Sequence, residues 1–293
     1  MTFSHVLLGA EGAPARITIR RIGFTDLKDA LAKGVDDFLA MPTHALFLCA
    51  IYPIIGLLLA RLAFGYSILP LLYPLASGFA LVGPLAALGL YELSRQREAG
   101  LDTSASHTLD VVHSSSFGAL VALGLLLLAL FALWIACANA IYVETFGYTP
   151  PASVGAFVHD PIHTTAGWTL ILVGNLVGLL FAVLVLTTTV VSFPLLLDRD
   201  VGAATALLTS IRAVLNNPIT MAAWGVIVVV LLFIGSLPLF LGLTVVLPIL
   251  GHATWHLYRK VVETDSPRPT LPKPPTKRRH AAQFPAVLFP WAR

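Results

Sequence analysis

The sequence predicts an all-α, polytopic membrane helix bundle with six transmembrane helices. Hydrophobic residues make up 57% of the 293 residues and charged residues only 11%, whereas soluble globular domains carry about 25% charged residues. The apolar residues lie in blocks long enough to cross a bilayer as helices, which needs about 20 residues. Lysine and arginine are concentrated in alternate connections between these blocks, as the positive-inside rule requires of a membrane protein.

The blocks define the six spans. The stretch Met221–Tyr258 is too long for one span, and it divides at residues 234–238 (IGSLP), where glycine, serine and proline favour a reversal of the chain. It therefore supplies the last two spans. The first four are predicted at Thr43–Leu62, Ile68–Tyr91, Phe117–Tyr142 and Trp168–Leu197.

The distribution of charge predicts the orientation. With a cytoplasmic N-terminus, 17 of the 18 lysine and arginine residues lie on the cytoplasmic side and only Arg61 lies outside. The long outer loop, residues 145–166, contains neither lysine nor arginine. A model with five spans would export the basic C-terminal tail, so we expect six spans with both termini in the cytoplasm.

Three stretches of the chain share a pattern that suggests three α-hairpin repeats. Each begins with a short amphipathic segment (residues 25–46, 106–120 and 204–224), and each returns through a span that contains a proline (Pro84, Pro194 and Pro248). We expect the amphipathic segments to lie at the cytoplasmic interface as helices. In the first of them, helical spacing predicts an apolar face made of Leu27, Leu31, Val35, Phe38 and Leu39. The alternative is that the likeness is fortuitous, because membrane helices often tolerate proline and apolar sequences align easily.

Three regions follow from this organisation. Residues 1–24 form a cytoplasmic N-terminal segment, residues 25–262 form the integral membrane domain, and residues 263–293 form a basic, proline-rich cytoplasmic tail whose composition predicts disorder. Two cysteines, both within apolar blocks, provide neither a disulfide framework nor a thiolate metal site.

Four stretches together resemble a family of bacterial integral membrane proteins known as domain of unknown function 2189. They are residues 20–38 (RRIGFTDLKDALAKGVDDF), 78–102, 192–218 and 247–260 (LPILGHATWHLYRK), and the resemblance covers roughly residues 16–262. It implies a multi-pass protein of the bacterial inner membrane. Members are sometimes labelled as cytochrome c oxidase subunits, but no activity comes with the family, so it assigns no catalytic residue.

Two pairs of histidines are candidates for a metal or haem site. His252 and His256 lie four residues apart near the end of the last span, and His44, at the inner start of the first span, would join them if the ends of the bundle meet. His159 and His163 flank Asp160 in the outer loop. The alternative for the first pair is an interfacial role, with Trp255 and Tyr258 forming an aromatic belt at the headgroups. We expect no cofactor, and we keep metal or haem binding as the less favoured hypothesis.

The remaining features favour a non-enzymatic role. No nucleotide-binding loop, serine-hydrolase elbow or zinc-protease motif occurs, and ionisable residues are missing from the middle of the predicted spans. We therefore expect an accessory, assembly or scaffold component of a membrane complex, with the respiratory chain as one option from the family label. The alternative is a transporter or channel for a small neutral or amphipathic solute. The expected partners are the lipid bilayer, another membrane complex or further copies of this chain, and no nucleic acid.

Overall fold

The structure is a computed structural model that describes residues 17–41, 69–81, 83–101, 116–148, 155, 159, 162–238 and 240–263. The described residues form helices and no strand, apart from an isolated antiparallel bridge between Ile19 and Val262. The helices are, in chain order, α2 (Phe24–Ala40), the short 3₁₀ helix η1 (Leu69–Leu71), α5 (Leu72–Leu81), α6 (Gly83–Ala86), α7 (Leu88–Glu98), α8 (Phe117–Phe146), α10 (Thr165–Thr189), α11 (Ser192–Asp198), α12 (Ala203–Asn216), α13 (Pro218–Ser236) and α14 (Leu243–Val261).

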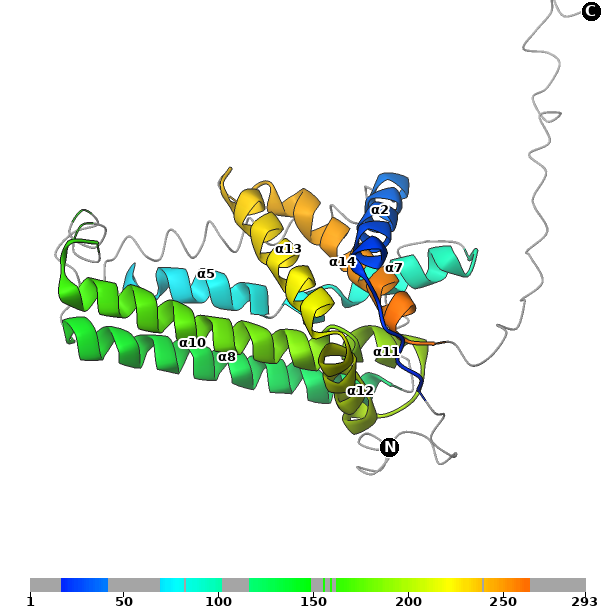
Figure 1. The fold of residues 1–293 in the computed structure, drawn as a ribbon, viewed down its shortest axis with the longest axis horizontal. Helices are drawn as coiled ribbons and strands as arrows, with labels where there is room; N and C mark the ends of the chain where they lie inside the picture. Colours follow the sequence, from blue (N-terminus) through cyan, green and yellow to red (C-terminus); the bar gives the residue numbers. More distant parts are fainter. Residues whose placement is uncertain are drawn as a thin grey trace, which may run out of the picture. The chain divides into compact units, whose positions relative to one another are not determined.

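Four helical segments in the described residues are long and apolar enough to cross a membrane. They are Tyr73–Glu98, Phe117–Phe146, Thr165–Asp198 and Pro218–Ser236. The second and third, built on α8 and α10, run side by side (Figure 1). This arrangement confirms the predicted class of all-α membrane bundle.

The reversal predicted in the last long block is confirmed, because α13 ends at Ser236 and α14 begins at Leu243. α14 is not among the four segments that qualify as spans, and the first predicted span, Thr43–Leu62, lies outside the described residues. The count of six spans and the threefold repeat therefore stay predictions. The basic tail also lies outside the described residues.

Proline interrupts the helix that contains Pro194. A proline has no N–H, so it leaves the carbonyl four residues earlier without its helical partner. α10 ends before Val190 and α11 begins after Val191. The hydroxyl of Ser210, on α12, binds backbone groups at this break. It accepts a hydrogen bond from the Val191 N–H (3.2 Å) and donates one to the Thr187 carbonyl (2.8 Å). Pro84 lies in α6, where the helical segment is also divided, and Pro248 lies inside α14.

The predicted apolar face of α2 is buried only in part. Its buried residues are Leu27, Ala30, Gly34 and Asp37, whereas Val35 and Leu39 are exposed. α12 shows the same pattern: Ala206, Ser210 and Ala213 are among its buried residues, and Leu208 and Leu215 are exposed. Both helices bury small residues against the bundle because these allow a close approach of backbones. Their large apolar side chains remain outside, which is compatible with a helix at the membrane interface.

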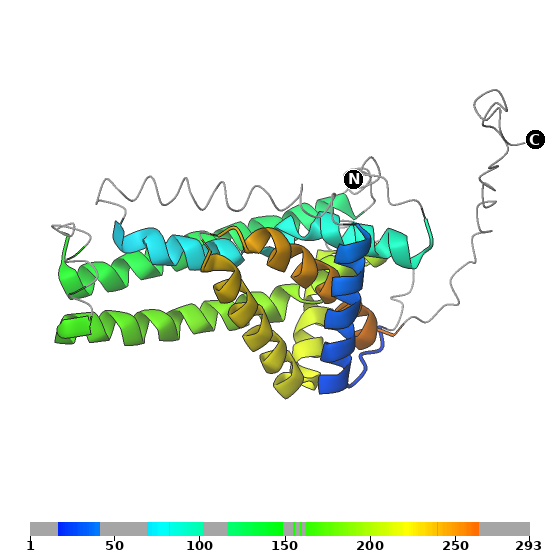
Figure 2. The same ribbon diagram turned by 90° about the horizontal axis from the view of Figure 1, so that it is seen from above.

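α2 and α14 cross at very short range (Figure 2). A Cβ atom added to Gly34 would lie 2.7 Å from both the backbone nitrogen and the Cβ of Ala253, and 2.8 Å from the carbonyl oxygen of Ile249. Only glycine fits at this crossing. The resulting contact brings the C-terminal halves of the two helices together and positions their polar side chains.

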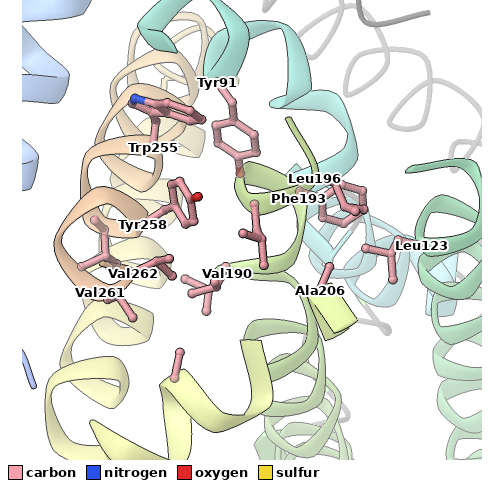
Figure 3. Packing of buried hydrophobic residues seen from close by; sticks show 14 of the residues in the cluster. Tyr91, Leu123, Val190, Phe193, Leu196, Ala206, Trp255, Tyr258, Val261 and Val262 are labelled. Atoms are coloured by element: carbon pink, nitrogen blue, oxygen red, sulfur yellow. The ribbon is translucent and has the colours of Figure 1, made fainter. Parts of the chain in front are cut away.

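A hydrophobic core joins α7, α8, α11, α12 and α14 (Figure 3). Trp255 and Tyr258 of α14 point toward Tyr91 of α7 and the α11 residues Phe193 and Leu196, and all five side chains are buried. The interpretation of Trp255 and Tyr258 as a lipid-facing belt is therefore wrong. Apolar neighbours enclose both rings and polar groups of other helices bind their N–H and O–H groups, so they lie inside the bundle.

Candidate functional site

A buried polar cluster lies where α2, α7 and α14 meet. It consists of Asp37 from α2, Ser94 and Arg97 from α7, and His252 and His256 from α14, and we call it the Asp37 cluster. Asp37 is its centre: Oδ2 accepts hydrogen bonds from the Ser94 hydroxyl (2.6 Å) and from Nε2 of His256 (2.8 Å), and Oδ1 accepts one from Arg97. One buried carboxylate thus links three helices.

Ser94 connects His252 to Asp37. The Ser94 hydroxyl has a single proton and gives it to Asp37, so it accepts from Nδ1 of His252, which lies 2.8 Å away. His252 is therefore protonated on Nδ1. Its other nitrogen, Nε2, is buried and has no hydrogen-bond partner among the described residues.

The environment of Asp37 favours its charged form. Burial by itself would raise the pKa of Asp37, but the hydrogen bonds from His256 and Ser94, the charge of His256 and the bond from Arg97 together outweigh it, so the pKa lies below its ordinary value. A buried carboxylate with this many donors is a stabilising element of the native structure. It is poorly suited to act as a base, because its oxygens are already engaged.

A second set of polar contacts continues from the cluster along α14. Trp255 Nε1 donates to Oε2 of Glu98 (3.0 Å), and Arg259 Nε lies 3.2 Å from Oε1 of the same carboxylate. Tyr258 donates to Oδ2 of Asp198 (2.7 Å), which also lies 3.3 Å from Nη1 of Arg259. These contacts join α14 to the ends of α7 and α11.

A cleft of about 460 Å³ opens beside the Asp37 cluster. All of its lining residues are ionisable, and they come from α2, α7 and α14: Lys33, Asp37, Arg97, Glu98, His256, Arg259 and Lys260. Four of them are permanently cationic and two are carboxylates. Each of the four cations is paired with a carboxylate in or beside the cleft, so the charges of the cleft are balanced.

The structure brings His252 and His256 into the same cluster, where their described contacts are with protein groups. Among the described residues, no group of three or more His, Cys, Asp or Glu side chains is placed to hold a metal ion. Ser94 lies between His252 and Asp37, and Nε2 of His256 is already bonded to Asp37. His44, the third candidate ligand, lies outside the described residues.

His159 and His163 also lie together. Their rings are stacked, with centroids 3.9 Å apart and planes 4° from parallel, and Nδ1 of His163 lies 2.8 Å from the backbone carbonyl oxygen of His159. A ring nitrogen bonded to a carbonyl must be protonated, so His163 could bind a metal only through Nε2. Asp160, between them in the sequence, lies outside the described residues.

Asp37, Ser94 and Arg97 were not identified from the sequence. The signal that points to Asp37 is its spacing: Leu27, Ala30, Gly34 and Asp37 follow one another at intervals of three or four residues, so Asp37 extends a buried stripe of small residues. Nothing comparable distinguishes Ser94 and Arg97, because their roles depend on helices that are distant in the chain.

One family model matches part of the chain. Residues 72–198 match the model of a family described as predicted integral membrane protein (DUF2189). The resemblance noted from the sequence is thereby confirmed for this part of the chain, which includes α7 with Ser94 and Arg97. No curated protein and no solved structure matches the chain.

Proposed function

Starting from the match of residues 72–198 to a family of predicted integral membrane proteins, we propose that this protein is a non-enzymatic scaffold or accessory component of a membrane complex. We place it in the bacterial inner membrane with both termini in the cytoplasm, as the distribution of lysine and arginine favours. A respiratory complex is one option for its partner.

The observation that carries the proposal is the exposure of α10. In the 18-residue apolar stretch of the segment Thr165–Asp198, only 6% of the stretch is buried. The corresponding stretches of α8 and α13 are 28% and 22% buried. The exposed side chains of α10 are large and apolar, and they include Leu172, Leu176, Leu179, Leu180 and Val183. A helix this weakly covered by its own chain has a broad surface for a helix of another membrane protein.

The chemistry of the Asp37 cluster also supports a structural role. Ser94 is fully buried and its hydroxyl is engaged by both Asp37 and His252, so a substrate cannot reach it. The alternative function, a carrier for a neutral or amphipathic solute, gains no support from the cleft, since its seven lining residues are all ionisable.

Site-specific cross-linking tests the proposal. A photoreactive amino acid replaces Leu176 or Leu180 on α10, and, as a matched control, Val226 on α13, which is equally exposed. We expect one other membrane protein to be cross-linked from both α10 positions and not from Val226, and to co-purify at fixed stoichiometry in mild detergent. Adducts with lipid alone would contradict the proposal, and so would cross-links to a second copy of this chain alone.

A further inference from the structure

The hairpin formed by α13 and α14 carries an inference that is independent of the scaffold role. We propose that it is a re-entrant hairpin, which enters the bilayer from the cytoplasmic side, contacts lipid acyl chains with its turn and returns to the same side. The turn, residues 237, 238 and 240–242, joins the end of α13 at Ser236 to the start of α14 at Leu243. The last two predicted spans then form one element that does not cross the membrane, and both termini stay in the cytoplasm.

The turn is apolar, and its large side chains are exposed. In the sequence of residues 226–250 the only polar side chains are those of Ser236 and Thr244. Leu237 is 66% exposed and Leu241 is 60% exposed. Apolar side chains of this size favour a hydrocarbon environment, so acyl chains suit the surface of the turn and the aqueous outer face of the membrane does not.

Polar groups around the turn are bonded within the hairpin itself. Seven backbone N–H groups between residues 237 and 246 donate to carbonyl oxygens between residues 234 and 242. The hydroxyl of Ser236 donates to the Leu232 carbonyl (2.7 Å), and the hydroxyl of Thr244 donates to the Leu241 carbonyl (2.6 Å). Because hydrocarbon offers no hydrogen bonds, a turn inside the bilayer has to satisfy its polar groups in this way.

The apolar part of α14 is too short to cross the bilayer. Leu243, its first residue, and His256, which lines the ionisable cleft, are 13 residues apart, which is about 20 Å along a helix. The hydrocarbon core of a bilayer is about 30 Å thick. Because every residue that lines the cleft is ionisable, the cleft lies at the aqueous border of the membrane. A turn at this distance from it stays inside the bilayer.

The direction of the hairpin agrees with a partial entry into the bilayer. α8 and α10 run side by side, and α13 and α14 slant away from their common direction in both views (Figures 1 and 2). The turn lies level with the middle of the two long helices, and not at the end where α8 finishes and α10 begins (Figures 1 and 2). α13 has 19 residues and is about 28 Å long. A slanted helix of this length crosses only part of the hydrocarbon core.

The test measures the accessibility and the depth of the turn in single-cysteine variants of the full chain, with both native cysteines replaced. The test variants are Leu237→Cys and Leu241→Cys, at exposed positions where a smaller side chain removes little packing. Tyr148→Cys, in the predicted outer loop, is the control for the outer surface. Leu180→Cys, exposed near the middle of the segment Thr165–Asp198, is the control for the bilayer interior.

On cells whose outer membrane has been removed, an impermeant maleimide should label Tyr148→Cys, and it should label neither turn variant before or after lysis. In proteoliposomes, a bimane attached to each cysteine reports its depth through quenching by brominated phosphatidylcholine. Bromine atoms near the ends of the acyl chains should quench the turn positions as strongly as Leu180→Cys, and bromine atoms beside the headgroups should quench them weakly.

Labelling of the turn variants from either side of the membrane overturns the proposal, because the turn would then lie in water. Strongest quenching by bromine atoms beside the headgroups also overturns it, since the hairpin would then reach a surface of the bilayer.

Discussion

Nε2 of His256 lies 2.8 Å from Oδ2 of Asp37, and this contact joins two residues that are 219 positions apart in the chain. It holds α2 against α14 together with the close crossing at Gly34, and Ser94 and Arg97 bring α7 to the same carboxylate. The helix α2, near the start of the chain, is thus fixed to the last described helix by a buried hydrogen bond. The behaviour of this carboxylate on mutation follows from its environment.

Replacement of Asp37 by asparagine is expected to lower the free energy of unfolding by about 2 kcal/mol, because three donors lose a charged acceptor in a buried site. Thermal unfolding in detergent or nanodiscs measures the effect. The neighbouring Asp36 is exposed, so Asp36→Asn removes the same charge and should change stability little. Equal losses in the two variants would show that the Asp37 cluster contributes nothing specific.

The stability that Asp37 provides is expected to depend on pH. Its pKa in the folded state lies below the ordinary value of 3.8, so its contribution is fully present above about pH 4 and is lost as the pH falls through the folded-state pKa. The difference in melting temperature between the wild type and Asp37→Asn should therefore shrink as the pH falls below about 4. A difference that is unchanged in strong acid would show that the carboxylate is not the stabilising species.

Substitution of Gly34 by alanine is expected to destabilise the protein by about 1–3 kcal/mol, although alanine favours a helix by about 1 kcal/mol. The added Cβ would lie 2.7 Å from backbone and side-chain atoms of Ala253, so α2 and α14 would have to separate. Gly174, within α10, has nothing within 4 Å of a built Cβ, and Gly174→Ala should be neutral or slightly stabilising. If both variants melt at the same temperature, the crossing is not tightly packed.

Ser94→Ala is expected to destabilise the protein by about 1–2 kcal/mol, because it leaves the Nδ1–H of His252 without its acceptor in a buried site. In a His252→Leu background the same substitution should cost less, and the difference is a coupling energy of about 1 kcal/mol. Ser236→Ala serves as the control, since that hydroxyl donates to the Leu232 carbonyl of its own helix. Strictly additive losses at Ser94 and His252 would contradict the hydrogen bond between them.

Hydropathy was sufficient to predict the apolar helices. α8 and α13, and the reversal after Ser236, are local properties of the sequence, and the structure confirms them. The position of the break at Val190 and Val191 does not follow from the sequence, because Pro194 comes three residues later and two β-branched apolar residues do not mark a helix end. The hydrogen bonds that allow it come from Ser210 on a different helix.

The buried face of α2 could not be predicted from apolar periodicity. In a soluble protein the large apolar side chains would face the core, but a membrane protein has apolar surroundings on its outside. Leu39 can therefore remain exposed while Gly34 and Asp37 are buried. In α2 the packed face is marked by Ala30 and Gly34, and Asp37 continues it at the same spacing. Its partners, His256 and Arg97, become visible only in three dimensions.

Labelling of single cysteines is expected to place Lys28 and Tyr148 on opposite sides of the membrane. The charge distribution predicts a cytoplasmic α2, and Tyr148, 91% exposed after the end of α8, lies in the predicted outer loop, which lacks lysine and arginine. In a background with Cys49 and Cys137 replaced, Tyr148→Cys should react with an impermeant maleimide on cells whose outer membrane has been removed. Lys28→Cys should react only after lysis. Reaction of both from one side would require an even number of spans between them. The predicted span Thr43–Leu62 would then not cross the membrane, because the segments Tyr73–Glu98 and Phe117–Phe146 are both long and apolar enough to do so.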